Sequence, residues 1–174
     1  MKNHIGENLT FSLPKSLNFD GAVGLFANSN LTAIPSALFK TNQSVIDLSY
    51  MFFNTKLTII NNFKLLNKFN NVSYCFANCS ELMDVSNIKT ESKINNIINY
   101  EGMFSDCASL IHGPEINFRQ LSNLNLNYMY YNCNHLEKVN VDIPSTSNIN
   151  SRSMFENCTS LTDVPSRNTK FYFR

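Results

Sequence analysis

Glycine and histidine are scarce in this 174-residue chain, and their scarcity excludes several kinds of catalytic site. Glycine occurs five times, and the chain contains no P-loop, no glycine-rich dinucleotide turn and no Gly-x-Ser-x-Gly nucleophile motif. Three histidines are present, and His135 has no Asp or Asn at a matching position that would orient it as a catalytic base. We therefore expect a protein that is not an enzyme and that holds no cofactor.

The chain also lacks an excess of charge and a long apolar run. Its 14 basic and 13 acidic residues leave a formal net charge of +1, which provides no electrostatic basis for binding nucleic acid or an anionic membrane. No apolar run approaches the about 18 residues of a membrane-spanning helix. No signal peptide is visible at the start of the sequence. We expect a protein inside a cell or a viral particle, or an export signal outside this sequence.

A short unit recurs along nearly the whole chain, and each copy is marked by an aromatic anchor. The last copy, residues 153–165, reads SMFENCTSLTDVP, with a Met before the anchor, a Cys three residues after it and a Leu six residues after it. The anchors follow one another at intervals of 26, 24, 28, 26 and 25 residues. A fixed period of about 20 to 50 residues indicates a solenoid or a related array. The six anchors are Phe26, Phe52, Phe76, Phe104, Tyr130 and Phe155.

Each unit is expected to contain two elements. Apolar residues around the anchors, as in residues 72–76 and 126–130, have the spacing of a short helix that neighbouring units must hold in place. Residues 82–85 and 136–141, which follow the Leu, are expected to be short strands. The sequence thus predicts an α/β fold, a leucine-rich-repeat-like solenoid of about six turns with a parallel sheet on one face and short helices and loops on the other. The loops are expected at 36–47, 61–71, 86–99, 115–125 and 142–150.

The whole chain, residues 1–174, is expected to form one domain. Residues 1–20 would be an N-terminal half-repeat or cap, residues 21–165 hold the six repeats, and residues 166–174 form a C-terminal tail. The tail is too short for a seventh unit, and an open solenoid end with exposed aromatic residues is a natural docking surface. We therefore expect an assembly contact there, with a minimal cap folded back on the sixth unit as the alternative. Its candidate residues are Phe171, Tyr172 and Phe173.

Asparagine is unusually common, with 28 residues in the chain, and one position in the unit concentrates it. Five of the six residues that lie two positions after the anchor are Asn, and the sixth is Asp106. Asparagine tolerates left-handed backbone geometry, so we expect a turn at this position. A row of exposed amides that binds a ligand is the alternative.

Cysteine also recurs at one position, three residues after the anchor. Cys79, Cys107, Cys133 and Cys158 occupy it, and Ser29 and Thr55 replace them in the first two units, which indicates a slot for a small buried side chain. The count of five cysteines excludes complete pairing within one chain. Disulfides between adjacent units and a metal site that includes the Cys75-x3-Cys79 pair remain alternatives.

These motifs resemble the BspA-like leucine-rich repeats, in particular a variant of unknown function from mycoplasma surface proteins. The family pattern runs as Asn-Val-(Thr/Ser)-x-Met-Phe-x-x-Cys-x-x-Leu-x-x-(Val/Ile), and residues 71–82 and 154–164 match it well. The resemblance covers about residues 20–165. It implies a surface-exposed adhesive protein of bacteria, some protists or their viruses, with no catalytic residues. The chain departs from the pattern in its first two units, which lack the Cys and bring the Leu one residue early.

The outward face of the sheet is the candidate site. If the valines of the strands point inward, their neighbours form columns on the outside, one of which would place Pro114 beside Asn140. We expect a protein-interaction module that adheres or binds through this face, and a structural component of a larger assembly, such as a phage or virus particle, as the alternative. A merely solvated face is the simpler interpretation of the same columns. The candidate protein-binding residues are Asp84, Ser86, His112, Lys138, Asn140 and Asp163.

Overall fold

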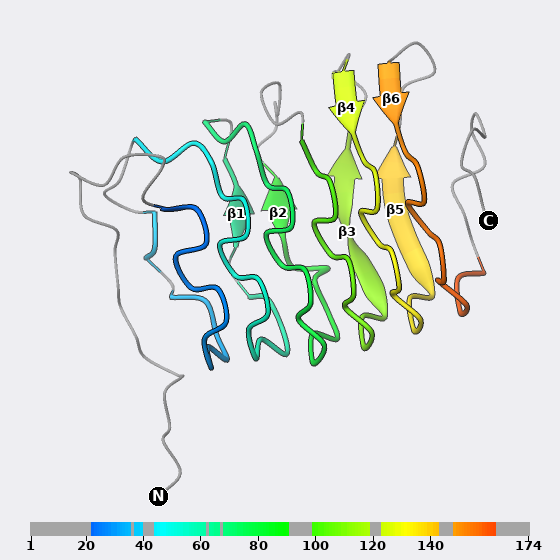
Figure 1. The fold of residues 1–174 in the computed structure, drawn as a ribbon, viewed down its shortest axis with the longest axis horizontal. Helices are drawn as coiled ribbons and strands as arrows, with labels where there is room; N and C mark the ends of the chain where they lie inside the picture. Colours follow the sequence, from blue (N-terminus) through cyan, green and yellow to red (C-terminus); the bar gives the residue numbers. More distant parts are fainter. Residues whose placement is uncertain are drawn as a thin grey trace, which may run out of the picture.

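The structure is β-rich, with short strands, many turns and, in its described part, no α-helix (Figure 1). The segments expected at residues 1–20 and 166–174 lie outside the described residues. The computed structural model describes residues 22–35, 37–39, 44–61, 63–66, 68–90, 99–118, 123–142 and 148–162.

Within the described residues, six short strands form three two-stranded parallel sheets. In Figure 1, β1, β2, β3 and β5 follow one another side by side, and β4 and β6 run in the opposite direction. Isolated parallel bridges from Ile59 to Asp84 and from Asp84 to His112 extend the same row. We call the four neighbouring strands and these bridged residues the strand layer. The pairs are β1 (Lys64–Leu65) with β2 (Lys89–Thr90), β3 (His112–Asn117) with β5 (Lys138–Asp142), and β4 (Asn123–Asn125) with β6 (Asn148–Asn150).

A second layer consists of consecutive turns around the anchors. In each of the first five segments, alternate N–H groups donate to carbonyl oxygens of the next segment, as Phe52 N does to Cys75 O at 2.9 Å. The N–H groups between them close turns within the segment, as Phe53 N does on Tyr50 O at 3.0 Å. Neighbouring segments are therefore held in a fixed register by their backbones. We call this the turn layer, formed by residues 22–31, 47–57, 71–82, 99–110, 125–136 and 150–161.

The prediction of short helices around the anchors is wrong. A helix requires each N–H to bond the carbonyl four residues earlier and every φ to be negative. Here alternate N–H groups bond the neighbouring segment, and two residues of each segment have positive φ, for example Tyr74 at 52° and Asn78 at 59°. The helix-like apolar spacing is instead produced by tandem turns, which bring side chains back to the core at similar intervals.

The loop predictions were also partly wrong, because four strands lie inside segments that we expected to be loops. These strands, β1, β2, β4 and β6, are two or three residues long and rich in Lys and Asn. Backbone pairing with the neighbouring segment maintains them, so their side chains need not alternate between apolar and polar. A pattern search based on side-chain burial cannot detect such strands.

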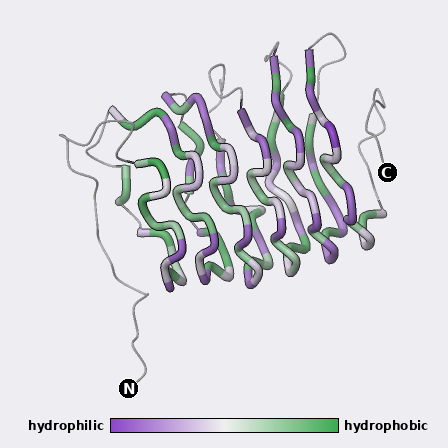
Figure 2. Tube along the Cα trace, viewed as in Figure 1, coloured by the Kyte–Doolittle hydropathy of each residue, from purple (hydrophilic) through white to green (hydrophobic). Residues whose placement is uncertain are grey.

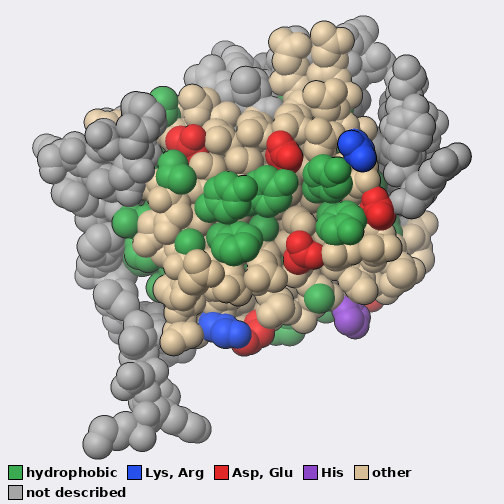
Figure 3. Space-filling model, viewed as in Figure 1, with side chains coloured by type: hydrophobic (Ala, Val, Ile, Leu, Met, Phe, Trp, Pro, Cys, Tyr) green, Lys and Arg blue, Asp and Glu red, His purple; other side chains and the backbone are tan. Residues whose placement is uncertain are grey.

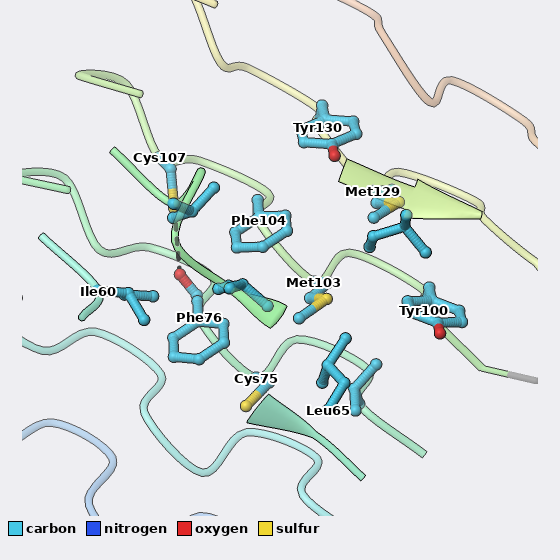
Figure 4. Packing of buried hydrophobic residues seen from close by; sticks show 14 of the residues in the cluster. Ile60, Leu65, Cys75, Phe76, Tyr100, Met103, Phe104, Cys107, Met129 and Tyr130 are labelled. Carbon is cyan, nitrogen blue, oxygen red and sulfur yellow. Dashed lines mark hydrogen bonds between the residues drawn. The ribbon is translucent and has the colours of Figure 1, made fainter. Parts of the chain in front are cut away.

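The core lies between the two layers and is built on the stacked anchors. Successive anchor rings lie 5.3–5.8 Å apart with interplanar angles of 2–13°, which confirms the predicted stack. Phe63, just before β1, packs edge-on against Phe52 and Phe76 and so joins the strand layer to the turn layer. Hydrophobic residues recur in successive segments (Figure 2), and Figure 4 shows the close packing of anchors, methionines and cysteines.

Candidate interaction surfaces

The predicted column on the sheet face is present in the strand layer. Parallel pairing places Asp84 beside His112 and His112 beside Lys138. His112 and Lys138 are exposed, and Asp84 is half-buried. The Ser86 N–H donates to Asp84 Oδ1 at 2.8 Å, and this bond lowers the pKa of the carboxyl group. The structure thus brings three of the candidate residues together, whereas Asp163 lies outside the described residues.

The second predicted column needs a correction. Ser86 and Asn140 are exposed as expected, but Pro114 is buried, and the residue that pairs with Asn140 is Glu115. Between its paired positions, β3 has one residue more than β5, which is the signature of a β-bulge. Gly113 stands in this bulge, and a Cβ there would lie 2.9 Å from the Tyr130 hydroxyl. The bulge therefore turns a predicted surface residue into the core.

The Asn row two positions after the anchors confirms the predicted turn and adds a side-chain ladder. All six of its residues have positive φ, between 53° and 63°. The Asn54 amide donates to Asn28 Oδ1 at 2.8 Å, and the Asn78 amide donates to Asn54 Oδ1 at 3.1 Å. The side chain of Asp106 has no N–H group and cannot continue this chain of bonds toward Asn78. It accepts a hydrogen bond from the Asn132 amide at 2.7 Å. The row therefore has a structural role in linking neighbouring segments.

A second row of Asn and Asp residues, five positions before the anchors, escaped the sequence analysis. Four of its five side chains accept a bond from the backbone N–H two residues later, as Asn71 Oδ1 does from Ser73 N at 3.0 Å. Such bonds initiate turns. The fixed distance to the anchor was a detectable signal in the sequence. The row contains Asp47, Asn71, Asn99, Asn125 and Asn150, and the first four make this bond.

The cysteine row belongs to the core. The Cys107 thiol donates to the Phe76 carbonyl oxygen of the preceding segment at 3.1 Å (Figure 4). Thr55, which replaces the cysteine in the second segment, donates through Oγ1 to the carbonyl oxygen of its own anchor, Phe52, at 3.0 Å. Burial raises the pKa of the Cys107 thiol well above its ordinary value and keeps the donor protonated. All five cysteines are free, and only Cys158 is less than fully buried. No group of three or more potential metal ligands occurs among the described residues.

The most distinctive surface lies on the turn layer and was also missed by the sequence analysis. Aromatic residues occur two positions before and one position after several anchors, and their rings pack on one another. Figure 3 shows hydrophobic side chains gathered in the middle of this face, with acidic side chains around them. We call this the aromatic face; its residues are Tyr50, Phe53, Tyr74, Tyr128 and Tyr131.

The comparisons with known proteins identify no relative. No protein-family model, no curated protein and no solved structure matches the chain. The resemblance to the BspA-like repeats therefore depends on the recurring motif alone. Within the part of the chain that the structure describes, there is no helix of the length and apolarity needed to cross a membrane. The candidate assembly contact at residues 171–173 lies outside that part.

Proposed function

We propose that the chain is a non-enzymatic protein-interaction module with the architecture of a leucine-rich-repeat-like solenoid of the BspA-like type. The observation that supports this most is the alignment of side chains into rows, since backbone bonds of about 3 Å hold equivalent positions of successive segments side by side. Rows that extend across several segments form broad surfaces, which suit a protein partner better than a small molecule. As such a module, the protein would act on a cell surface or on a viral particle.

The sheet-face column is the first surface that we assign to a partner. It combines a carboxylate, an imidazole and an amine on neighbouring strands, at Asp84, His112 and Lys138. His112 and Lys138 are exposed, so a partner can reach them without rearrangement of the backbone. A column of mixed charge matches a polar protein surface and does not favour a polyanion.

A capture experiment with matched variants tests this proposal. The immobilised chain is exposed to extracts of candidate host envelopes, and bound proteins are quantified by mass spectrometry. The double variant His112→Gln and Lys138→Gln should lose the proteins that the unmodified chain captures. Lys56→Gln removes a charge from the ion pair with Glu81, which is not part of the column, and should retain them. Identical capture by all three proteins would contradict the assignment of the sheet face.

A further inference from the structure

The aromatic face consists of two groups of rings, one on the second and third segments and one on the fifth segment. The Tyr50 and Tyr74 rings stack with centroids 5.1 Å apart and an interplanar angle of 10°. Phe53 meets Tyr50 edge-on at 5.8 Å, and Tyr128 meets Tyr131 in the same way at 5.8 Å. Tyr50 is 42% exposed, and the other four residues are half-buried. The rings are therefore partly open to solvent while they pack on one another.

Tyr74 connects the two parts of this surface. Its ring lies over Gly102 of the next segment, where a Cβ would come within 2.2 Å of the Tyr74 Cε1 atom. Its hydroxyl donates to Glu101 Oε1 at 3.2 Å, and Glu101 Oε2 accepts a bond from the Asn125 amide at 2.8 Å. Burial, followed by the Glu101 carboxylate, raises the pKa of Tyr74 to about 12. The phenol therefore keeps its proton, and the carboxylate remains in place at the edge of the rings.

Four carboxylates border the rings, and none of them has a basic partner among the described residues. Asp47 lies five residues and Glu101 three residues before an anchor. Asp106 lies two residues and Glu156 one residue after an anchor, and all four belong to rows that flank or contain the rings. All four are half-buried, and the bonds that they accept come from neutral amides and hydroxyls. The only ion pair between described residues joins Lys56 to Glu81. The carboxylates are Asp47, Glu101, Asp106 and Glu156.

Rings bordered by unpaired carboxylates are the arrangement that recognises an organic cation. A Lys ammonium or an Arg guanidinium over a tyrosine face is attracted within about 6 Å of the ring centroid. A carboxylate beside the ring adds a charge-assisted hydrogen bond, which is stronger than a neutral one. The six described turn segments contain one Lys, Lys56, and one Arg, Arg152, which lies in the row of Glu101. The carboxylates outnumber these cations, so the net charge of this surface is negative.

We propose that the aromatic face binds a basic polypeptide segment, with Lys or Arg side chains over the tyrosine rings and beside the carboxylates. This site is distinct from the sheet-face column and takes a partner of defined charge. An uncharged glycan is a different class of ligand that also stacks on aromatic rings and can donate hydroxyl hydrogen bonds to carboxylates, but it carries no positive charge for them to attract. The negative border therefore favours the basic segment.

Binding is measured by fluorescence anisotropy with a labelled peptide of alternating arginine and glycine. A peptide with glutamate in place of arginine and a labelled neutral oligosaccharide serve as comparison ligands. The arginine peptide should bind, and its affinity should fall as salt is added, because both partners are charged. The glutamate peptide and the oligosaccharide should not bind. Absence of arginine-peptide binding, or equal binding of the oligosaccharide, would overturn the proposal.

The variants are chosen so that each new residue already occupies the same position in another segment. Asp47→Asn and Asp106→Asn introduce the amide that all the remaining segments, from the second to the sixth, have at these positions. Tyr50→Gly introduces the residue that the first and fourth segments have at this position, as Gly24 and Gly102. Gly102 and Tyr50 both have φ of 56°, so the glycine is free of strain there. These substitutions should therefore preserve the fold, which circular dichroism and thermal melting verify.

The expected peptide affinities distinguish the rings and their bordering carboxylates from charges elsewhere on the protein. The double variant Asp47→Asn and Asp106→Asn, and the single variant Tyr50→Gly, should each weaken peptide binding about tenfold. Glu81→Gln removes one charge at a distance from the rings and should leave affinity within about twofold. Equal weakening by Glu81→Gln would show that only net charge matters, and unchanged binding in Tyr50→Gly would show that the rings do not contribute. Either result would overturn the site.

Discussion

The turn layer and the strand layer are formed by alternating stretches of one chain but differ in regularity. In the turn layer, twelve residues of positive φ, six stacked anchors, four side-chain amide links and four thiol links recur at the same positions. In the strand layer, strands range from two to six residues, and a bulge interrupts β3. The difference shows that the turn layer depends on particular residues at set positions, whereas the strand layer accommodates variation in strand length and register. Substitutions in the turn layer should therefore be the more damaging.

The largest effect is expected from an anchor. Phe104→Ala leaves a cavity in a fully buried stack and should cost about 3–5 kcal/mol of unfolding free energy. Ile59→Ala, in the strand layer at 41% exposure, should change stability by less than about 0.5 kcal/mol. Urea denaturation measures both. A cost below about 1 kcal/mol for Phe104→Ala would contradict the buried stack.

Alkaline pH should also act on the turn layer, because buried thiols and phenols are concentrated there. Burial raises the pKa of Cys75, Cys107 and Cys133 well above its ordinary value and that of Cys158 to about 11. An acid whose pKa is higher in the folded state stabilises the fold below its unfolded pKa and loses that contribution as pH rises through the folded value. Stability should be constant from pH 6 to about 8 and should fall progressively above about 9. A flat profile of melting temperature up to pH 11 would indicate that these groups are accessible to solvent.

A smaller effect is expected at the left-handed turns. Asn78→Ala forces a side chain with a Cβ and no polar group into φ of 59° and removes the ladder bond to Asn54, so it should cost about 1–2 kcal/mol. Asn78→Gly loses the bond but tolerates the backbone, so its cost should be clearly smaller. Thermal melting of the pair separates the two contributions. Equal costs would mean that the backbone conformation is unimportant.

The smallest effect should have the opposite sign. The Tyr130 hydroxyl is buried and has no hydrogen-bond partner among the described residues. Tyr130→Phe removes this unsatisfied group and should stabilise the chain by about 1 kcal/mol. Phe104→Tyr serves as the comparison, because it adds a hydroxyl to the same stack at a position without the facing glycine that Gly113 provides for Tyr130. Destabilisation by Tyr130→Phe would show that the hydroxyl has a partner.

The sequence allowed the prediction of those features in which one residue type serves one geometric need. The anchor stack, the turn at the Asn row and the buried Cys row were all visible in the sequence, because each needs a ring, a left-handed residue or a small donor at a set position. The helices were wrong because tandem turns produce the same apolar spacing. The aromatic face was missed because only the second, third and fifth segments carry its rings, so no row in the sequence repeats it.

The Asn ladder also determines how deamidation would change this protein over time. Deamidation would convert an Asn of the row into a carboxylate, which can no longer donate to the segment before it but can still accept from the segment after it. Asp106 already has the chemistry of such a deamidated position: it gives nothing to Asn78, it accepts from Asn132, and the Ser105 hydroxyl bonds its second oxygen at 2.8 Å. In the other segments the residue before the Asn is Ala, Phe, Tyr or Glu, and none of these offers that hydroxyl at the same place. Chemical ageing would therefore open the ladder one bond at a time, everywhere except at the segment that is already adapted to it.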